Sequence, residues 1–124
     1  MEESTPARPN RRRRTTNLAR RWAEAIRGTS YVPLNRRELD DYLDDLTSGL
    51  SRAVRAPELD IAAIREIGAT MVGAHFTGPE SLERTLTVLG EEMTLSAEPL
   101  LQERALPTLS ALATGFAEAL RTRT

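Results

Sequence analysis

Five aliphatic residues in the first half of the chain repeat at steps of four, three, four and four. They are Leu39, Leu43, Leu46, Leu50 and Val54. That spacing places them on one face of an α-helix, whereas the side chains of a strand alternate with a period of two. Asn35 can cap this helix, with Glu38 at the capping-box position, and Pro57 closes the segment. The sequence therefore predicts a long amphipathic helix with one apolar face to bury.

The rest of the chain has helical periodicity too, and no segment shows a strand pattern. A first helix is predicted from Asn17, with a left-handed Gly28 at its end. Later helices are predicted from about Asp60 to Phe76, from Pro79 to Leu89 with a stop at Gly90, and around Pro107, which interrupts or starts the last one. Glu91 to Glu98 is either an extra turn or a loop before a helical piece from Pro99. The predicted fold is all-α, a bundle of four main helices with one or two short extra helical pieces.

The start of the chain has a different composition. Residues 1–14 combine proline, polar residues and the run Arg11, Arg12, Arg13 and Arg14 without periodic apolar residues, which predicts a disordered basic arm. Residues 15–124 are predicted to form a single helical regulatory domain. The arginine run could contact a polyanion, either nucleic acid or an anionic surface, without sequence specificity, or it could serve only as a solubilising tail.

The residue inventory excludes several function classes. Cysteine is absent, which excludes disulfides, thiolate zinc sites and a cysteine nucleophile, and a cytoplasmic setting is the simplest interpretation. No phosphate-binding loop or nucleophile elbow occurs, and no apolar run approaches the roughly 20 residues of a membrane-spanning helix. We therefore expect a protein that is not an enzyme and needs no cofactor or metal.

The segment from Gly73 to Leu82 joins two predicted helices and contains the only histidine, His75. Thr77 and Glu80 fit a capping box around Gly78 and Pro79. By spacing, His75 falls on the apolar stripe of the preceding helix, where three interpretations stay open: a hydrogen-bonded residue at a helix end, a ligand-pocket residue, or a haem ligand.

The helix that precedes this segment contains unusually many small residues, which suggests a close approach of two helices or a small cavity. From these features we predict one candidate ligand pocket. Its residues are Trp22, Tyr31, Gly68, Met71, Gly73 and His75.

The last helix is still periodic where the chain ends. Its apolar stripe consists of Leu109, Leu112, Phe116 and Leu120. A helix of this kind is typical of a dimer seam or of a relay into a following domain, so self-association through this stripe is expected.

Two segments carry a family resemblance: residues 20–34, RRWAEAIRGTSYVPL, and residues 74–86, AHFTGPESLERTL. They resemble the N-terminal helical region of actinobacterial multidomain signalling proteins, which continue into PAS, GGDEF and EAL domains and make or degrade cyclic di-GMP. The likeness covers about residues 18–122 and implies a cytoplasmic input or dimerisation module that acts on a downstream domain. Because neither catalytic domain lies in this chain, neither activity is carried over. The alternatives are a helical sensor of the non-haem globin type and an accessory protein that binds a polyanion through the arm.

Overall fold

A computed structural model describes residues 7–30 and 32–123, with side chains from residue 17 onward. This part of the chain contains five helices: α1 (Ala7–Ile26), α2 (Arg36–Arg55), α3 (Ile61–Gly73), α4 (Pro79–Thr94) and α5 (Pro99–Arg123). Since it contains no strand, the predicted all-α fold class is confirmed. None of the helices in the described ranges combines the length and the apolar character that crossing a bilayer requires.

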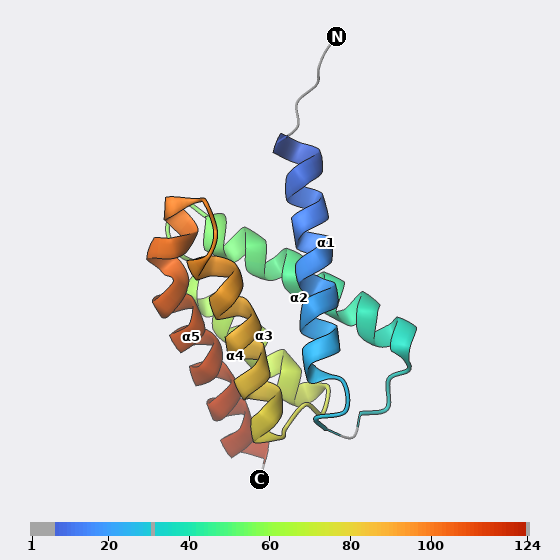
Figure 1. Ribbon diagram of the computed structural model, residues 1–124. Coiled ribbons are helices and arrows are strands. Elements are labelled where there is room, and N and C mark those ends of the chain that lie inside the picture. The colour runs from blue at the N-terminus through green and yellow to red at the C-terminus, as the bar shows by residue number, and fades with distance from the viewer. Residues whose placement is uncertain (1–6, 31, 124) are drawn as a thin grey trace.

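The helices pack in two connected groups (Figure 1). α3 and α5 share the most extensive contact of any two helices, and α4 joins them as the antiparallel neighbour of α5. α1 packs against α2 and α4, while α2 crosses behind α1 and reaches both α3 and α5. One hydrophobic core runs through both groups, from Trp22 on α1 to Phe116 on α5.

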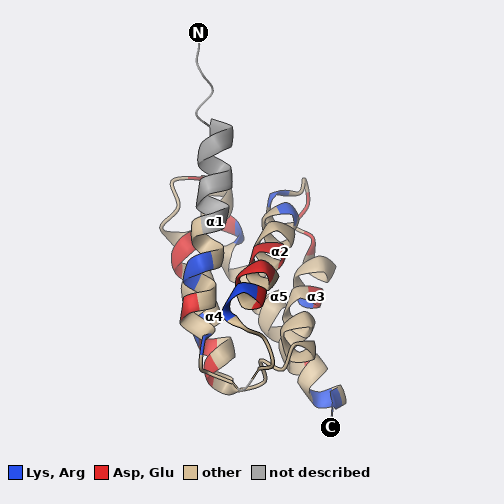
Figure 2. Ribbon diagram, turned by 90° about the vertical axis from the view of Figure 1, so that its right-hand side faces the viewer, with Lys and Arg blue, Asp and Glu red and all other residues tan. Residues whose placement is uncertain are grey.

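The long amphipathic helix predicted from the leucine repeat is α2, and its predicted start and end are confirmed. The Asn35 side chain accepts the Glu38 amide at 2.8 Å, and the Glu38 carboxylate accepts the Asn35 amide at 2.9 Å. The five repeat residues are all buried. The opposite face of α2 carries exposed acidic residues, and acidic segments lie on both α2 and α4 in Figure 2.

Helix α1 begins at Ala7, earlier than the predicted start at Asn17. Of the predicted arm, residues 1–6 lie outside the description, and residues 7–14 are described by their helical backbone alone. The side chains of Arg11 to Arg14, the candidate polyanion contact, therefore lie outside the described part of the structure. At the other end, Gly28 has a φ of 82°, the left-handed conformation predicted for it.

Several predictions about helix ends in the second half of the chain are wrong. Helix α4 does start at Pro79, but its N-cap is Gly78 and no side chain caps it, so the Thr77 capping box does not form. The Gly78 amide instead donates to Ser30 Oγ at 3.1 Å. Gly90 does not stop α4, which continues to Thr94. A Cβ at this position would lie 3.3 Å from Leu109 Cδ1, so the glycine has a packing role inside the helix.

Pro107 neither starts nor interrupts the last helix, since α5 continues through it. Its side chain is exposed, so the hydrogen bond that proline cannot make is lost on the solvent side. The short helical piece predicted from Pro99 is the first part of α5.

Two glycines allow α3 and α5 to touch through their backbones. A Cβ on Gly68 would lie 2.2 Å from the Leu112 carbonyl oxygen, and one on Gly115 would lie 1.9 Å from the Arg65 carbonyl oxygen. Both distances are shorter than any van der Waals contact, so only glycine fits at either position. The predicted close approach at Gly68 is confirmed, whereas a Cβ on Gly73 would meet nothing within 4 Å.

Candidate functional site

A small cavity lies where α1, α2, α4 and the start of α5 meet. Its volume is about 60 Å³, and one side opens to solvent. The wall is mostly aliphatic, formed by Leu18, Leu50, Val54, Leu89, Met93 and Leu101. A smaller set of polar side chains completes it: Thr47, Ser51, Arg55, Glu92, Ser96 and Glu98. An apolar wall with a few polar groups is the usual composition of a small-molecule site.

Three of the polar residues form a row along α2, because Thr47, Ser51 and Arg55 are each four residues apart. With a rise of about 1.5 Å per residue, the row is about 12 Å long. It begins at a buried hydroxyl and ends at an ion pair beside the opening. The row lies beside the leucine repeat on α2. Its three polar side chains at helical spacing are the one sequence pattern that could have indicated this cavity.

The hydroxyl of Thr47 is the unusual member of this row. The residue is only 1% exposed, and within the described residues its Oγ1 has no hydrogen-bond partner. A buried hydroxyl without a partner costs about 1–3 kcal/mol. Thr47 thus lines the cavity, but its hydroxyl oxygen is itself shielded from the cavity space.

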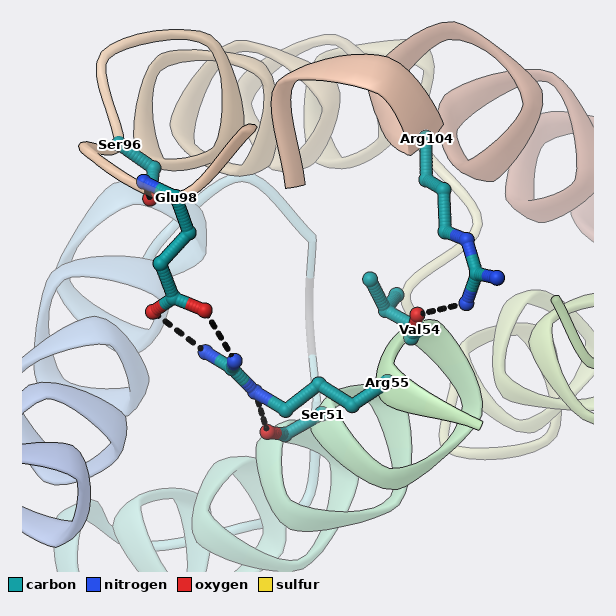
Figure 3. A network of polar contacts seen from close by, with 6 residues as sticks. All are labelled: Ser51, Val54, Arg55, Ser96, Glu98 and Arg104. Atoms are coloured by element: carbon teal, nitrogen blue, oxygen red, sulfur yellow. Dashed lines mark hydrogen bonds and ion pairs between the residues drawn. The ribbon is translucent and has the colours of Figure 1, made fainter. Parts of the chain in front are cut away.

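Figure 3 shows an ion pair between two residues of the cavity wall. The Arg55 guanidinium donates to the two Glu98 carboxylate oxygens at 2.5 and 3.3 Å, and its Nε donates to Ser51 Oγ at 3.2 Å. The Glu98 amide donates to Ser96 Oγ at 3.0 Å. Because the two side chains are 24% and 32% exposed, they are partly shielded from solvent and form a stronger pair than a fully exposed one.

Glu98 also belongs to the start of α5. Its carbonyl oxygen accepts the amides of Leu101 at 3.1 Å and Gln102 at 3.2 Å, so the residue caps the first turn of that helix. The same residue therefore joins the opening of the cavity to the beginning of α5.

A second arginine near the site has a structural role. Arg104 on α5 donates to the carbonyl oxygens of Val54, Ala56 and Pro57 at 2.6, 2.7 and 2.9 Å. These carbonyls lie at the C-terminal end of α2, where they lack helical partners and where positive charge is favourable. Arg104 thus fixes the end of α2 that carries Arg55.

The candidate pocket predicted from the sequence does not correspond to this cavity. Trp22 is fully buried, and its Nε1 donates to Thr85 Oγ1 at 2.8 Å. Met71 is also fully buried, whereas Gly68 is covered by the α5 backbone and Gly73 is exposed. Tyr31 lies outside the described residues. The described members are thus core, interface or surface positions, and none of them lines the cavity.

His75 does not point along the buried stripe of α3, as its spacing predicted. It is exposed and has a φ of 76°, the left-handed conformation. Its amide donates to the Val72 carbonyl and the Phe76 amide to the Met71 carbonyl, both at 2.9 Å, which is a Schellman turn with the usual contact between two buried apolar residues.

The His75 ring is held by the last residue of α5. Arg123 Nη2 lies 3.2 Å from His75 Nδ1, and Arg123 Nη1 donates to the Val72 carbonyl at 3.1 Å. Because a guanidinium only donates, Nδ1 is the acceptor in this pair. Of the three interpretations of His75, the hydrogen-bonded residue at a helix end describes the geometry.

The stripe of α5 that was predicted to form a dimer seam packs mostly inside the fold. Leu112 and Phe116 are buried, because the glycine contact brings α5 directly onto α3. Leu109 and Leu120 are half-buried against the same core. The first two residues are therefore not available to a partner chain.

The two segments that carry the family resemblance lie against each other. Trp22 bonds Thr85, and the buried Ser81 hydroxyl lies 2.6 Å from Thr29 Oγ1 and 2.9 Å from Ser30 Oγ. Arg84 Nη1 donates to the Ala25 carbonyl oxygen at 3.2 Å. The resemblance thus falls on one structural unit, the contact of α1 and its following loop with α4.

Within the described residues, no three His, Cys, Asp or Glu side chains gather as a metal site would require. A Glu-Ala-Leu tripeptide does occur on α5, but its exposed glutamate, Glu118, belongs to no such group. Comparison of the chain with protein-family models, with curated proteins and with solved structures gives no match. The likeness to cyclic di-GMP signalling proteins therefore stays a prediction that rests on the two segments.

Proposed function

We propose that the protein is a non-enzymatic sensory module of a bacterial signalling system that binds a small organic molecule in its cavity. The observation that carries this proposal is the mostly apolar cavity itself, whose wall also includes the Arg55–Glu98 ion pair. Polar atoms of a bound molecule would meet the polar side chains of that wall. The aliphatic wall would hold the rest of the molecule.

A sensor also needs a route from its ligand to the rest of the chain, and Glu98 offers one. Its carboxylate pairs with Arg55 beside the opening, while its carbonyl caps the first turn of α5. A molecule that displaced the carboxylate would act directly on the residue that starts α5. This supports the expectation that the last helix relays the signal.

A binding role fits the cavity better than a catalytic one. The residues that line it include two serines but no histidine or cysteine, and its two glutamates each pair with an arginine. A serine nucleophile needs a base within hydrogen-bond reach. The lining supplies polar contacts for a ligand without that pairing.

The resemblance extends this proposal to a biological setting. It favours a cytoplasmic input or dimerisation module that controls a downstream domain, and cyclic di-GMP signalling is the system it suggests. Any self-association would use surfaces other than Leu112 and Phe116, since both lie in the core.

The test measures thermal unfolding of the full chain with a panel of small organic acids, alcohols and amines. We expect one class to raise Tm with increasing concentration, as a ligand of the native state must. Ser51→Leu, which puts a larger side chain into the cavity wall, should abolish the effect. Ser48→Leu on the exposed face of the same helix should retain it. Equal responses of the two variants would show that the molecule binds elsewhere.

A further inference from the structure

The mouth of the cavity is specific enough to name the chemical class of its ligand. We propose that the ligand is a short aliphatic carboxylate, which binds Arg55 in place of Glu98 while its chain occupies the cavity. This inference rests on the proposed binding function and adds the ligand class and the way in which binding acts on the fold.

The first argument is the geometry of Arg55. Its guanidinium already binds a carboxylate through two oxygens, the arrangement in which arginine recognises this group best. It stands at the solvent end of the polar row on α2, and the aliphatic wall lies beside it. A molecule with a carboxylate at one end and a hydrocarbon chain behind it matches both features.

The second argument concerns which half of the ion pair can leave. Arg55 belongs to a helix, and its Nε bond to Ser51 keeps the guanidinium beside the cavity. Glu98 lies on the connector between α4 and α5 and is the more exposed of the two. An incoming anion would take the place of the glutamate, whereas an incoming amine would have to displace a side chain anchored on helix α2.

The third argument is size. A cavity of about 60 Å³ is small, although it holds more than one water molecule. A chain of a few carbon atoms fits this space, whereas a nucleotide or a fused ring system does not. Hexanoate is therefore a suitable probe.

Exchange of the carboxylates has a consequence for the fold. It would remove the Arg55–Glu98 link between α2 and the α4–α5 connector, while the Arg104 contacts with the end of α2 remain. Glu98 also acts as an internal competitor, so wild-type binding should be weak, and removal of its charge should strengthen it.

The test is calorimetric titration of the full chain with hexanoate, 1-hexanol and hexylamine, which share one chain length. We expect wild type to prefer hexanoate, and Glu98→Gln to bind hexanoate about tenfold more tightly with little change for the alcohol. Arg55→Met should remove the preference for the acid. The Glu98 variant keeps the test decisive should the Arg55 variant fold poorly.

Three results would overturn the inference, and they do not all have the same meaning. Equal affinity for acid and alcohol, unchanged in Glu98→Gln, would show a cavity ligand that is not a carboxylate, and the proposed binding function would stand. Preference for hexylamine would reject the carboxylate in the same way. Absence of binding by all three probes to wild type and to Glu98→Gln would overturn this inference, and only the broader panel with the Ser51→Leu control would then decide the binding function.

Discussion

The contact between α3 and α5 and the meeting point of α1, α2 and α4 represent two ways of packing helices in one small protein. At the first, Gly68 and Gly115 bring backbone against backbone with no room for a methyl group. At the second, longer side chains lie between the helices, and a cavity of about 60 Å³ remains.

The difference separates a rigid scaffold from a region that can respond. A close-packed interface has one arrangement and resists change, whereas a cavity beside a partly exposed ion pair can accept a molecule at small cost. Binding sites need such regions, which is why the candidate site lies at the looser packing.

The largest effect is expected for Gly68→Ala, which tests the close contact of α3 with α5. The new methyl group would meet the Leu112 carbonyl, so the helices must separate, and we expect a loss of at least about 3 kcal/mol in the free energy of unfolding. Gly49→Ala is the matched control, because its nearest neighbours lie at 3.9 Å and alanine favours a helix by up to about 1 kcal/mol. Urea denaturation measures both, and a neutral Gly68→Ala would contradict the tight interface.

Arg104→Met tests how firmly the cavity end is held. Loss of three hydrogen bonds to the end of α2 should cost about 2 kcal/mol, since hydrogen bonds from a charged group are the stronger kind. The control is Arg52→Met on the exposed side of α2, which should stay within about 0.5 kcal/mol of wild type. Similar losses in both variants would mean that charge, rather than the contacts, is responsible.

Two threonines test whether the cavity affects the groups around it. The hydroxyls of Thr47 and Thr108 are both buried without a partner among the described residues. Only Thr47 lines the cavity, which is large enough to admit a water that its hydroxyl would reach after a rotation of the side chain. Thr108→Val should therefore raise the free energy of unfolding by about 1 kcal/mol, and Thr47→Val by clearly less. The same denaturation experiment decides this, and a larger gain at Thr47 would argue for a dry cavity.

A further test concerns Tyr42, which packs α2 onto α3. Its hydroxyl donates to the Thr70 carbonyl at 3.0 Å, its ring stacks on Phe76, and burial raises its pKa. The unfolded tyrosine loses its proton above pH about 10 while the folded one keeps it, so stability falls as pH rises through that range, by at most about 1.4 kcal/mol per pH unit.

The sequence is favourable for this measurement, because lysine and cysteine are absent and few other groups titrate there. Thermal unfolding between pH 8 and 11 should show the decline in wild type. Tyr42→Phe should lose about 1 kcal/mol at neutral pH, from the missing hydrogen bond, and should show a flatter alkaline profile. An equally steep profile in the variant would assign the decline to another group.

Prediction from the sequence succeeded where the signals are local. Helix α2 has its capping box, its apolar repeat and its closing proline within its own segment, so all three were read correctly. Gly90 was misread as a stop, because a glycine inside a helix looks the same in sequence as a glycine after one. His75 was misplaced for a similar reason, since helical spacing does not show where a helix ends in a left-handed turn.

The candidate site was missed because it is not local. Its wall comes from three helices, the start of a fourth and a connector, and only tertiary packing brings Thr47, Met93 and Leu101 together. The same limit applies to the last helix: Leu112 and Phe116 were expected at a surface, and the glycines that draw them into the core belong to two different helices.

The glycine contact also orders events during folding. α3 and α5 are separated in the chain by the whole of α4, so the bare backbone around Gly68 has no cover until α5 has been synthesised. A nascent chain can form α1 and α2 early, but the tightest part of its core is completed late. Before then, the part of α3 that α5 covers is open to the solvent.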